Sequence, residues 1–555
     1  MKKPLLVAVA PTLLDEAFAG LGYELAILSP GPGIHDAAAL CAERGLVPDL
    51  FLQREVLGPR TLLCNLEALA CPTVFWSLDT HLNAWWQGHY GRLFGRVVCT
   101  QKDWLPALAS MGVERPGWLP WPGEARGVVP FGARAHQAAF VGRITDARPV
   151  RMLFADFLSR EGLADILPET PREDMLRLYG QTRLIPNETI LGEVNWRVFE
   201  AASCGALALH PLSGIGTDNG IAELFEPGRE IAVFSDALEL GSLLRHYRKN
   251  AAEAEKMALA GRARVLAEHL PEHRAQAIAR AAQSPATPLT GPEAARELWL
   301  AAALLFQAGI LPVGLQALVS GLEAHLSDPA CFEAILRCRY VSGKKDEALA
   351  MAHGLLAAEA LEGDLGLDAA CSGLCLREGR FDTAKAFWYR RARAAGDACP
   401  DKPEDPAALL ALWARELAQA GAAWRPGFSY DPDADIPASA LECLLSARIH
   451  APGDIRLLAR LEAFLRGLPG SEYVRLGCLA DISLRQPNDW RVGVRLGLLD
   501  LRLFRLAEGL DEIGRARTLA ASRGEAVAFE RFLRGAGGAR LAGGAGAGGG
   551  SPLEK

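Results

Sequence analysis

The chain of 555 residues lacks the features that mark several large classes of protein. It has no apolar stretch approaching the roughly 18 residues that a membrane-spanning helix needs. It has no long run of Lys and Arg, and its formal net charge is −7, which argues against nucleic-acid binding and against a basic membrane patch. Its 12 cysteines include no CxxC pair and no His/Cys cluster at zinc spacing, so we expect a reduced, cytoplasmic compartment.

The first half also lacks two motifs that would require a bound metal or cofactor. No Asp-x-Asp triplet follows a predicted strand in residues 1–280, so the sequence predicts no obligatory metal ion. Gly31-Pro-Gly33 is not the G-x-G-x-x-G fingerprint, which must follow the first strand directly, and this disfavours a nicotinamide-dependent dehydrogenase. We therefore expect no cofactor.

The apolar start of the chain superficially resembles a signal peptide. Its apolar run, Leu5–Ala10, is only six residues long before Pro11, and acidic Asp15 and Glu16 follow. We therefore expect a first buried strand there.

Residues 1–135 alternate apolar strands with helical stretches, and a second alternation occupies residues 136–283. The expected strands are Leu5–Ala10, Glu24–Ser29, Leu50–Gln53, Val74–Leu78, Val97–Thr100, Gln137–Arg143, Ala164–Leu167, Thr182–Pro186, Ala206–Pro211 and Ile231–Phe234. Continuous apolar strands separated by helices predict parallel sheets with both faces covered. The sequence thus predicts two Rossmann-like domains, joined near residues 118–131, with a ligand-binding crevice between them.

The remainder of the chain is predicted to be helical. Residues 284–292 read as a linker, residues 293–535 as helices, and the Gly-rich residues 536–555 as a disordered tail. Gly309, Gly343 and Gly379 lie 34 and 36 residues apart, and a small residue follows each of them five positions later. A glycine turn followed by a small residue where two helices touch resembles the tetratricopeptide repeat, and Leu503–Leu510 looks like a degenerate later copy. The predicted fold class is therefore α/β plus all-α.

The segment Asn195–Ala206 carries the most information about function. We expect Asn195 to cap a short helix, with its side chain accepting a backbone N–H, and Gly205 to end the helix in a left-handed conformation. At helical spacing Val198, Phe199 and Ala202 form an apolar face, while Arg197 and Glu200 lie on the other side. The helix alone leaves open a simple surface ion pair between Arg197 and Glu200.

These residues, together with Phe140–Arg143 and Glu223–Phe234, resemble the nucleotide-sugar half of group 1 glycosyltransferases of the GT-B fold. Thr73–Asn83 and Val98–Asp103 extend the resemblance to about residue 280, and it is closest to bacterial proteins related to spore-maturation glycosyltransferases. The resemblance implies a two-domain transferase, with residues 1–135 on the acceptor side and 136–283 on the donor side. It also implies that Glu200 binds the ribose diol of the donor.

The chain departs from the family pattern at two points. Glu193 and Glu200 are separated by six residues where many members have seven, so only Glu200 aligns with its neighbours. The usual Lys after the Val-Gly-Arg motif is absent, and Arg148 and Arg151 lie nearby instead; a guanidinium can bind a diphosphate bidentately.

The predicted donor-binding set combines a ribose contact, cations for the diphosphate and a loop of backbone amides. Its members are Arg143, Arg148, Arg197, Glu200, Ser213, Gly214, Gly216, Thr217 and Glu223. Glycines let backbone N–H groups approach an anion, which suggests a phosphate cradle at residues 213–217, although a tight turn between strand and helix is an equal alternative. Arg148 is equally compatible with a solvated loop.

Asp79 and His81 are the predicted catalytic residues on the acceptor side. Both follow an apolar strand, and both can accept a hydrogen bond from an acceptor hydroxyl; Asp79 is alternatively a helix cap. The nearby Trp85, Trp86 and Tyr90 suit either sugar stacking or, more often, core packing.

The leading hypothesis is a cytoplasmic, metal-independent and retaining glycosyltransferase that uses a nucleotide-sugar. Its helical repeats would hold an acceptor protein or glycan, since superhelical repeat arrays offer extended concave surfaces. Two alternatives stay open: a catalytically inactive sugar-nucleotide-binding scaffold, which the two departures favour, and a GT-B sugar-nucleotide epimerase.

Overall fold

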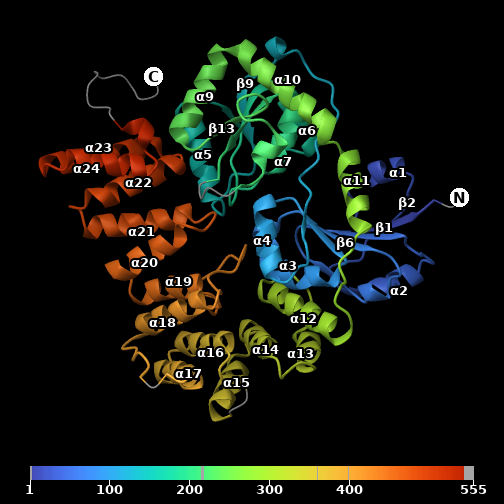
Figure 1. Cartoon of the computed structure of the whole chain (residues 1–555), viewed down its shortest axis with the longest axis vertical. Coiled ribbons are helices and arrows are strands. Elements are labelled where there is room, and N and C mark those ends of the chain that lie inside the picture. The colour runs from blue at the N-terminus through green and yellow to red at the C-terminus, as the bar shows by residue number, and fades with distance from the viewer. Residues whose placement is uncertain (1–2, 214–217, 359–360, 398, 543–555) are drawn as a thin grey trace. The chain divides into compact units, whose positions relative to one another are not determined.

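The computed structural model describes residues 3–213, 218–358, 361–397 and 399–542 (Figure 1). Two compact units divide the chain: Met1–Pro120 with Glu272–Pro452, and Trp121–Pro271 with Gly453–Lys555. Each unit therefore combines one α/β domain with one part of the helical region. Among the described residues, no helix is both long and apolar enough to cross a membrane.

The α/β domain of the first unit contains a six-stranded parallel sheet. Its strands, in spatial order, are β2 (Glu24–Leu28), β1 (Leu5–Val9), β4 (Leu50–Arg54), β6 (Thr73–Ser77), β7 (Arg96–Cys99) and β8 (Gly117–Trp118). Leu6, Val7 and Ala8 are completely buried, as expected for a strand covered on both faces. All five strands predicted for this domain are confirmed.

Three short strands of this unit were not predicted. β3 (Gly33–Asp36) pairs in parallel with β5 (Thr61–Cys64) in a small separate sheet, and β8 lies at the edge of the main sheet. β3 reads Gly-Ile-His-Asp and β8 has two residues, so neither presents an apolar run. The helices of this domain are α1 (Asp15–Gly20), α2 (Ala37–Ala42), α3 (Thr80–Tyr90), α4 (Leu105–Ser110) and α11 (Pro271–Ala282).

Helix α11 and the segment after it pack on the first α/β domain, although the sequence grouped residues 272–283 with the second. Arg274 Nε of α11 donates to Pro120 O at 2.7 Å. In the predicted linker, the Ala286 N–H donates to Gly95 O at 2.7 Å and the Leu289 N–H to Arg92 O at 3.1 Å. These backbone contacts hold the connecting segment against the sheet domain.

The helical part of the first unit runs from α12 to α19. Its helices are α12 (Gly291–Gln307), α13 (Leu315–Glu323), α14 (Pro329–Val341), α15 (Lys345–Ala357), α16 (Leu365–Arg377), α17 (Phe381–Ala394), α18 (Pro406–Gln419) and α19 (Ala440–His450). Glu297 of α12 is buried and contacts His89 Nδ1 at 2.7 Å and Arg92 Nη1 at 2.8 Å. This carboxylate joins the helical part to α3 and the turn after it.

The predicted glycine turns connect consecutive helices. Gly343 lies between α14 and α15 and Gly379 between α16 and α17, with φ of +81° and +70°, which is the left-handed region that glycine adopts most readily. The small residues five positions later, Ala348 and Ala384, are completely buried. The helix–turn–helix pattern is therefore confirmed, whereas membership of the tetratricopeptide family stays a prediction.

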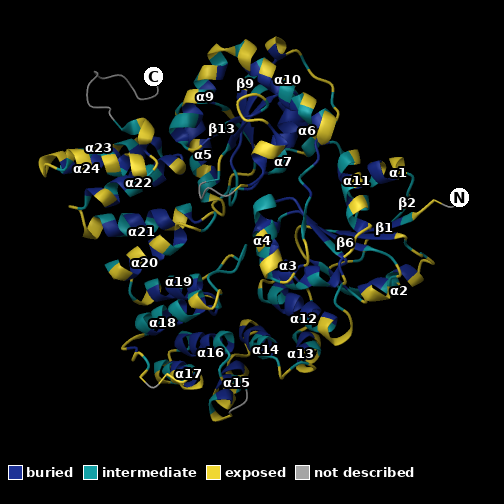
Figure 2. Ribbon diagram, viewed as in Figure 1, coloured by how far each residue is buried: buried dark blue, intermediate teal, exposed yellow. Residues whose placement is uncertain are grey.

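The second unit contains a five-stranded parallel sheet in the order β10-β9-β11-β12-β13. The strands are β9 (His136–Val141), β10 (Asp165–Leu167), β11 (Thr182–Pro186), β12 (Leu207–Pro211) and β13 (Ala232–Phe234). The surrounding helices are α5 (Pro149–Arg160), α6 (Arg172–Gly180), α7 (Trp196–Ser203), α8 (Ile221–Leu224), α9 (Ala237–Lys249) and α10 (Ala251–Glu268). The α/β plus all-α fold class, with two Rossmann-like domains, is thus confirmed. The inner strands, such as β4, β6 and β12, are mostly buried, whereas the edge strands β2 and β10 are not, and Figure 2 shows exposed residues on the outer faces of the helices.

The helical part of the second unit shares a core with its α/β domain. Its helices are α20 (Ile455–Leu465), α21 (Glu472–Arg485), α22 (Trp490–Arg502), α23 (Leu506–Ser522) and α24 (Ala526–Gly535). Phe504, in the turn between α22 and α23, packs its ring 4.8 Å from Phe154 and 6.3 Å from Phe234. Its φ is +62°, and Gly509 follows five positions later, so this turn has the spacing of the predicted degenerate repeat.

The chain stays ordered beyond the predicted start of the disordered tail. Residues Ala539–Leu541 form a 3-10 helix, and Arg540 Nη2 lies 2.6 Å from Glu239 Oε1 of α9. Ala536, Leu541 and Ala542 pack against the shared core. The Gly-rich composition of this segment gave no indication that its few apolar residues would pack against the core. Residues 543–555 lie outside the described part.

Phe504 provides a test of the shared core. Phe504→Ala should lower the free energy of unfolding of the second unit by about 3–5 kcal/mol, because it removes a buried ring from contact with α5 and β13. Urea unfolding of the full chain, followed by hydrogen exchange in α5 and α22, measures this. Val527→Ala, at a 75% exposed position of α24, should change the value by less than about 0.5 kcal/mol. Equal effects of the two variants would contradict the shared core.

Candidate functional site

The candidate site lies at the carboxyl ends of β9 and β11 in the second unit. The strand order places β10 on one side of β9 and β11 on the other, so the chain reverses direction across the sheet between β9 and β11. Ligands of open α/β sheets bind at such a switch point, outside the carboxyl ends of the strands. The residues that follow these two strands are Gly142–Arg143 and Asn187–Glu188.

Arg197 joins the two strand ends. Its Nη1 donates to Asn187 Oδ1 at 2.6 Å and its Nη2 to Val141 O at 3.3 Å, while its Cζ lies 4.9 Å from the centre of the Phe140 ring. Burial by itself lowers the pKa of this guanidinium, but its interaction with the Tyr179 hydroxyl and the charge of Glu188 outweigh burial and raise the pKa above its usual value. Arg197 therefore stays charged inside a network of protein acceptors.

Helix α7 begins and ends as predicted, but its cap differs. Asn195 occupies the N-cap position with extended backbone, and Gly205 follows the helix at φ +66°. The side chain of Asn195 makes no capping hydrogen bond: its Nδ2 donates to Glu188 O and Asn187 Oδ1, at 3.0 and 3.1 Å. The expected cap bond was wrong because Asn195 Oδ1, the atom that would accept it, accepts instead from Asn187 Nδ2 at 3.0 Å.

A buried histidine completes this polar network. His210, near the end of β12, is fully buried, and its Nδ1 accepts from Asn187 Nδ2 at 3.0 Å. Burial lowers the pKa of His210 to about 3, so the ring is neutral at physiological pH. Asn187 is thus held by Arg197, Asn195 and His210 together.

Glu200 lies one turn further along α7 and is only 6% exposed. Its Oε1 accepts from Arg172 Nε at 3.2 Å, where Arg172 is the first residue of α6. The guanidinium of Arg172 also stacks 4.2 Å from the centre of the Trp196 ring and contacts Glu124. The surface Arg197–Glu200 pair that the helix alone left open is not formed, because Arg197 faces the strand ends and Arg172 takes the carboxylate.

The environment of Glu200 makes its carboxyl group a weaker acid than an exposed glutamate. Burial raises its pKa from 4.5 to about 7, and the charges of Arg172 and Arg197 only partly offset this. Trp121 stacks on Trp196 with ring centres 5.1 Å apart and planes 11° apart. A carboxylate beside a cation and stacked aromatic rings is equipped to hold a polar ligand with a flat group.

Two predicted diphosphate ligands, Arg143 and Arg148, lie at the surface beyond β9. Arg143 follows the strand by two residues, and Arg148 occupies the N-cap position of α5. Desolvation lowers the pKa of Arg148, and the charges of Arg151 and Arg143 lower it further. Within the part of the chain that the structure describes, neither Arg143 nor Arg148 makes an ion pair, so this positive charge is available to an anion.

Arg151 has a different environment. It is buried, and its Nε donates to Glu188 Oε2 at 2.7 Å. Removing either partner of such a buried pair leaves an uncompensated charge, so the pair fixes the loop after β11. Of the two arginines that replace the usual Lys, only Arg148 is exposed.

The remaining predicted donor ligands follow β12. Ser213 is partly exposed and lies next to Gly192: a Cβ at Gly192 would be 3.4 Å from Ser213 Oγ. Gly214, Gly216 and Thr217 lie outside the described residues. Glu223 is exposed in the first turn of α8, after Gly220 at φ +85°. The donor roles of these residues stay predictions.

Asp79 and His81 lie where the sequence placed them, directly after β6. Asp79 occupies the N-cap position of α3, without a side-chain capping bond, and His81 is 1% exposed in the first turn. Glu55, which follows β4, accepts from the Leu78 and Asp79 N–H groups at 2.8 and 2.9 Å through one oxygen. Burial and the charge of Asp79 raise the pKa of Glu55. The catalytic roles of Asp79 and His81 stay predictions.

The nearby aromatic residues belong to the core. Trp86 and Tyr90 are almost completely buried, and the Tyr90 hydroxyl donates to Gln53 Oε1 at 2.6 Å. Trp85 packs against Phe428, with ring centres 5.3 Å apart. Of the two interpretations left open by the sequence, core packing is correct for Trp86 and Tyr90.

Sequence reasoning missed Arg172, Asn187, Glu188, His210 and Glu55. Asn187 and Glu188 directly follow a predicted strand, as does Glu55 after one further residue, so polarity at strand ends would have found them. Arg172 and His210 carry no such signal. Arg172 reaches Glu200 from 28 residues away, which depends on how α6 packs beside α7.

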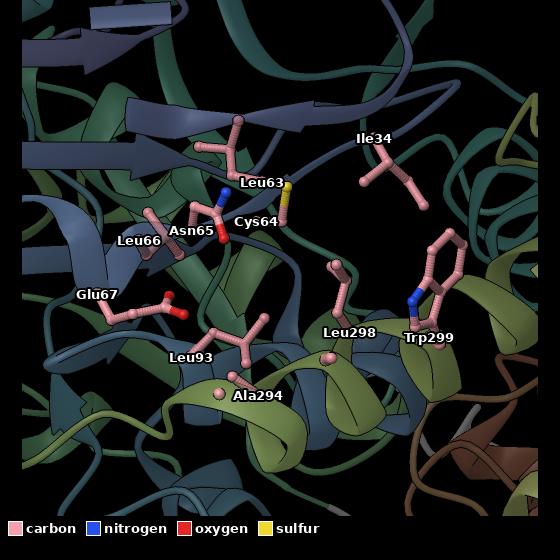
Figure 3. A pocket seen from close by; sticks show the side chains of 12 residues that line it. Ile34, Leu63, Cys64, Asn65, Leu66, Glu67, Leu93, Ala294, Leu298 and Trp299 are labelled. Atoms are coloured by element: carbon pink, nitrogen blue, oxygen red, sulfur yellow. The ribbon is translucent and has the colours of Figure 1, made fainter. Parts of the chain in front are cut away.

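A separate hollow of about 220 Å³ lies in the first unit, between the β3–β5 sheet and α12. Figure 3 shows its mostly apolar lining, with Leu63, Leu93, Leu298 and Trp299 around it and Asn65 and Glu67 at one side. None of the predicted site residues lines it. Among the described residues, no group of three or more His, Cys, Asp and Glu side chains is placed to hold a metal ion.

Residues 147–280 match the glycosyl transferase-like family model. The matched segment extends from α5 to α11 and includes Glu200, Arg197 and Arg172. It includes most of the candidate site but a minor part of the chain. No curated protein matches the sequence.

Several solved structures are weakly similar. A glycosyltransferase from Rickettsia africae ESF-5 is 10% identical, with a TM-score of 0.37, and the alignment covers 50% of this chain and 98% of that one. A sucrose-phosphate synthase from Thermosynechococcus elongatus is 11% identical, with a TM-score of 0.36 and coverage of 50% and 98%. The TPR protein YrrB is 12% identical, with a TM-score of 0.18 and coverage of 39% and 100%. The fold assignment rests on the strand orders of the two sheets.

The raised pKa of Glu200 predicts a pH-dependent contribution to stability. In the unfolded chain the carboxyl loses its proton near pH 4.5, whereas in the folded chain it keeps the proton up to about pH 7. The free energy of unfolding of the wild type, relative to Glu200→Gln, should therefore fall by about 1–3 kcal/mol as the pH rises from 4 to 8. Urea titrations of both proteins across this range measure the difference, and parallel pH profiles would contradict the buried carboxyl.

Proposed function

We propose that the chain is a glycosyltransferase that moves a sugar from a nucleotide-sugar to an acceptor hydroxyl. The observation that carries the proposal is the buried Glu200 of α7, which Arg172 contacts from the first turn of α6, within the segment that matches the glycosyl transferase-like model. The resemblance to group 1 enzymes implies a donor-ribose role for a carboxylate at this place. The position next to the β9/β11 switch point agrees with that role.

The residues proposed for the donor site have two roles: some contact the nucleotide-sugar, and others hold the site in position. Glu200 accepts from the ribose diol, and Arg143 and Arg148 face the diphosphate, because they are the exposed cations beyond β9. Arg197 has both Nη atoms bound to protein acceptors, so it positions the strand ends rather than the donor. In this proposal Ser213, Gly214, Gly216 and Thr217 add backbone donors, and Glu223, in the first turn of α8, belongs to the same donor-binding set.

The chemistry requires charge stabilisation at the leaving group. The bond between the anomeric carbon and the diphosphate oxygen breaks, and the acceptor oxygen forms a new bond to that carbon. The arginines stabilise the developing negative charge on the diphosphate, which accepts the proton of the hydroxyl in a retaining, metal-independent transfer. Asp79 and His81 orient the acceptor, with Glu55 fixing the backbone before Asp79.

The helical parts are proposed to recruit the acceptor, a protein or a surface glycan. Stacked helix pairs with glycine turns offer an extended surface for this. We further propose that they are tetratricopeptide-like repeats and that the chain acts in the cytoplasm of a bacterium, as a relative of spore-maturation glycosyltransferases.

Two observations favour a second function, a sugar-nucleotide-binding scaffold without activity. His81 is 1% exposed and Arg151 is bound to Glu188, so two candidate groups are engaged by the protein itself. Detectable donor binding without hydrolysis or transfer would support this function.

The donor site is tested by thermal stability in the presence of UDP-, GDP-, dTDP- and CMP-sugars. At about 100 times Kd, a bound donor should add roughly 2.7 kcal/mol to the unit that binds it. Glu200→Ala should abolish the shift, because it removes the ribose contact and leaves Arg172 with Glu124 in place of both carboxylates. Glu253→Ala, an exposed carboxylate of the same unit, should keep it. A shift that survives Glu200→Ala would contradict the assignment of Glu200.

The acceptor side is tested by turnover with whichever donor binds. Asp79→Asn and His81→Ala should each lower kcat by about 10–100-fold and leave donor affinity unchanged, because both act on the acceptor. His353→Ala, at an exposed position of the same unit, serves as the control. Full turnover by both Asp79→Asn and His81→Ala would refute their catalytic assignment.

A further inference from the structure

The loop between α18 and α19, residues 420–439, reaches from the helical part of the first unit to the carboxyl edge of its sheet (Figure 1). Trp424 packs on Trp104, which follows β7, with ring centres 5.8 Å apart. Phe428 packs on Trp85 of α3, with ring centres 5.3 Å apart. The loop thus contacts the segments that follow two neighbouring strands, β6 and β7.

Gly427 is the point of closest approach. A Cβ at this position would lie 2.7 Å from His81 O and from the Leu82 carbonyl carbon, distances that no ordinary side chain permits. The φ of Gly427 is +81°, so glycine is favoured by the backbone as well as by the space. The loop backbone therefore lies directly on the first turn of α3, against the backbone of the predicted catalytic residue His81.

The loop is held firmly from its own side. Backbone bonds close its base, from the Ala440 N–H to Ala422 O and from the Leu441 N–H to Ala423 O, both at 3.0 Å. Arg425 forms two bonds to the buried Glu442, at 2.6 and 3.0 Å.

Further along the loop, the buried Arg337 of α14 donates to Ile436 O and Pro437 O, at 2.6 and 2.9 Å. Bidentate guanidinium contacts combine strength with fixed geometry. The helical part thus presents this loop to α3 as a rigid element.

We propose that residues 424–428 form a wall of the acceptor subsite, which excludes water from the reaction and restricts the acceptors that reach His81 and Asp79. The inference rests on the proposed glycosyltransferase activity. Because this wall belongs to the helical part, acceptor selection depends on both the helical part and the α/β domain of the first unit. The helical part then both recruits an acceptor and shapes the place where its hydroxyl reacts.

Hydrolysis of the donor in the absence of any acceptor measures water exclusion. In this reaction a water oxygen bonds to the anomeric carbon, the bond to the diphosphate breaks, and the products are free sugar, nucleoside diphosphate and a proton. Excluding water suppresses this side reaction. A displaced wall should accelerate it without changing the affinity for the donor.

Gly427→Ala and Gly421→Ala form a matched pair for this test. Gly421 lies in the same loop at φ +86°, so its substitution carries similar backbone strain, but a Cβ there meets no atom within 4 Å. In the full chain, Gly427→Ala should raise amide exchange in residues 79–86 and raise donor hydrolysis by about threefold or more. Gly421→Ala should stay at the wild-type value in both measurements, and both variants should keep the wild-type donor Kd.

Each other outcome has a distinct meaning. An unchanged rate of donor hydrolysis in Gly427→Ala, with or without increased amide exchange in α3, would contradict the proposed wall. A loss of donor affinity in place of a rise in hydrolysis would also overturn it, since the loop would then act on the donor. If no UDP-, GDP-, dTDP- or CMP-sugar binds the wild type, the proposed function itself fails and the wall fails with it.

Discussion

The guanidinium of Arg197 connects helix α7 to the ends of two strands, and the geometry of the candidate site depends on that connection. A charge removed from water is tolerated only where protein acceptors replace the water, and here Val141 O and the side chain of Asn187 do so. Asn187 is in turn fixed by His210 and Asn195. Because α7 is thereby set against β9 and β11, the carboxylate one turn further along it reaches the N-terminus of α6.

That carboxylate, Glu200, illustrates how burial and charge compete at the site. Desolvation outweighs the nearby arginines and raises its pKa to about 7, so a change of pH or a bound ligand alters its charge under ordinary conditions. Arg172 balances it while stacking on Trp196 and contacting Glu124. Arg143 and Arg148, by contrast, are exposed beyond β9. The site therefore combines a buried, adjustable acid with surface cations, which suits a ligand that has both hydroxyl and phosphate groups.

The helical parts are integral to the two units rather than appended to them. In the first unit, Glu297 contacts α3, and Gly427 lies against its first turn. In the second unit, Phe504 packs in the aromatic core, and Gly470 lies so close to the side chain of Leu191, in the loop between β11 and α7, that a Cβ at Gly470 would clash with it. In each unit, a turn of the helical part touches the carboxyl edge of the sheet. Changes in the helices can thus reach the residues proposed to bind donor and acceptor.

The sequence by itself determined the two parallel sheets, the bounds of α7, the left-handed Gly205 and the glycine turns at Gly343 and Gly379. These features depend on contiguous residues, because burial of a strand on both faces, a helical apolar face and a positive φ each produce a local pattern in the sequence. The tertiary structure alone decided that Arg172 pairs with Glu200 and that Asn195 turns away from the helix end. It also decided that the helical region divides between two units. Such partners come from distant segments, and which of them meet depends on how the packed elements bury charge and apolar surface together.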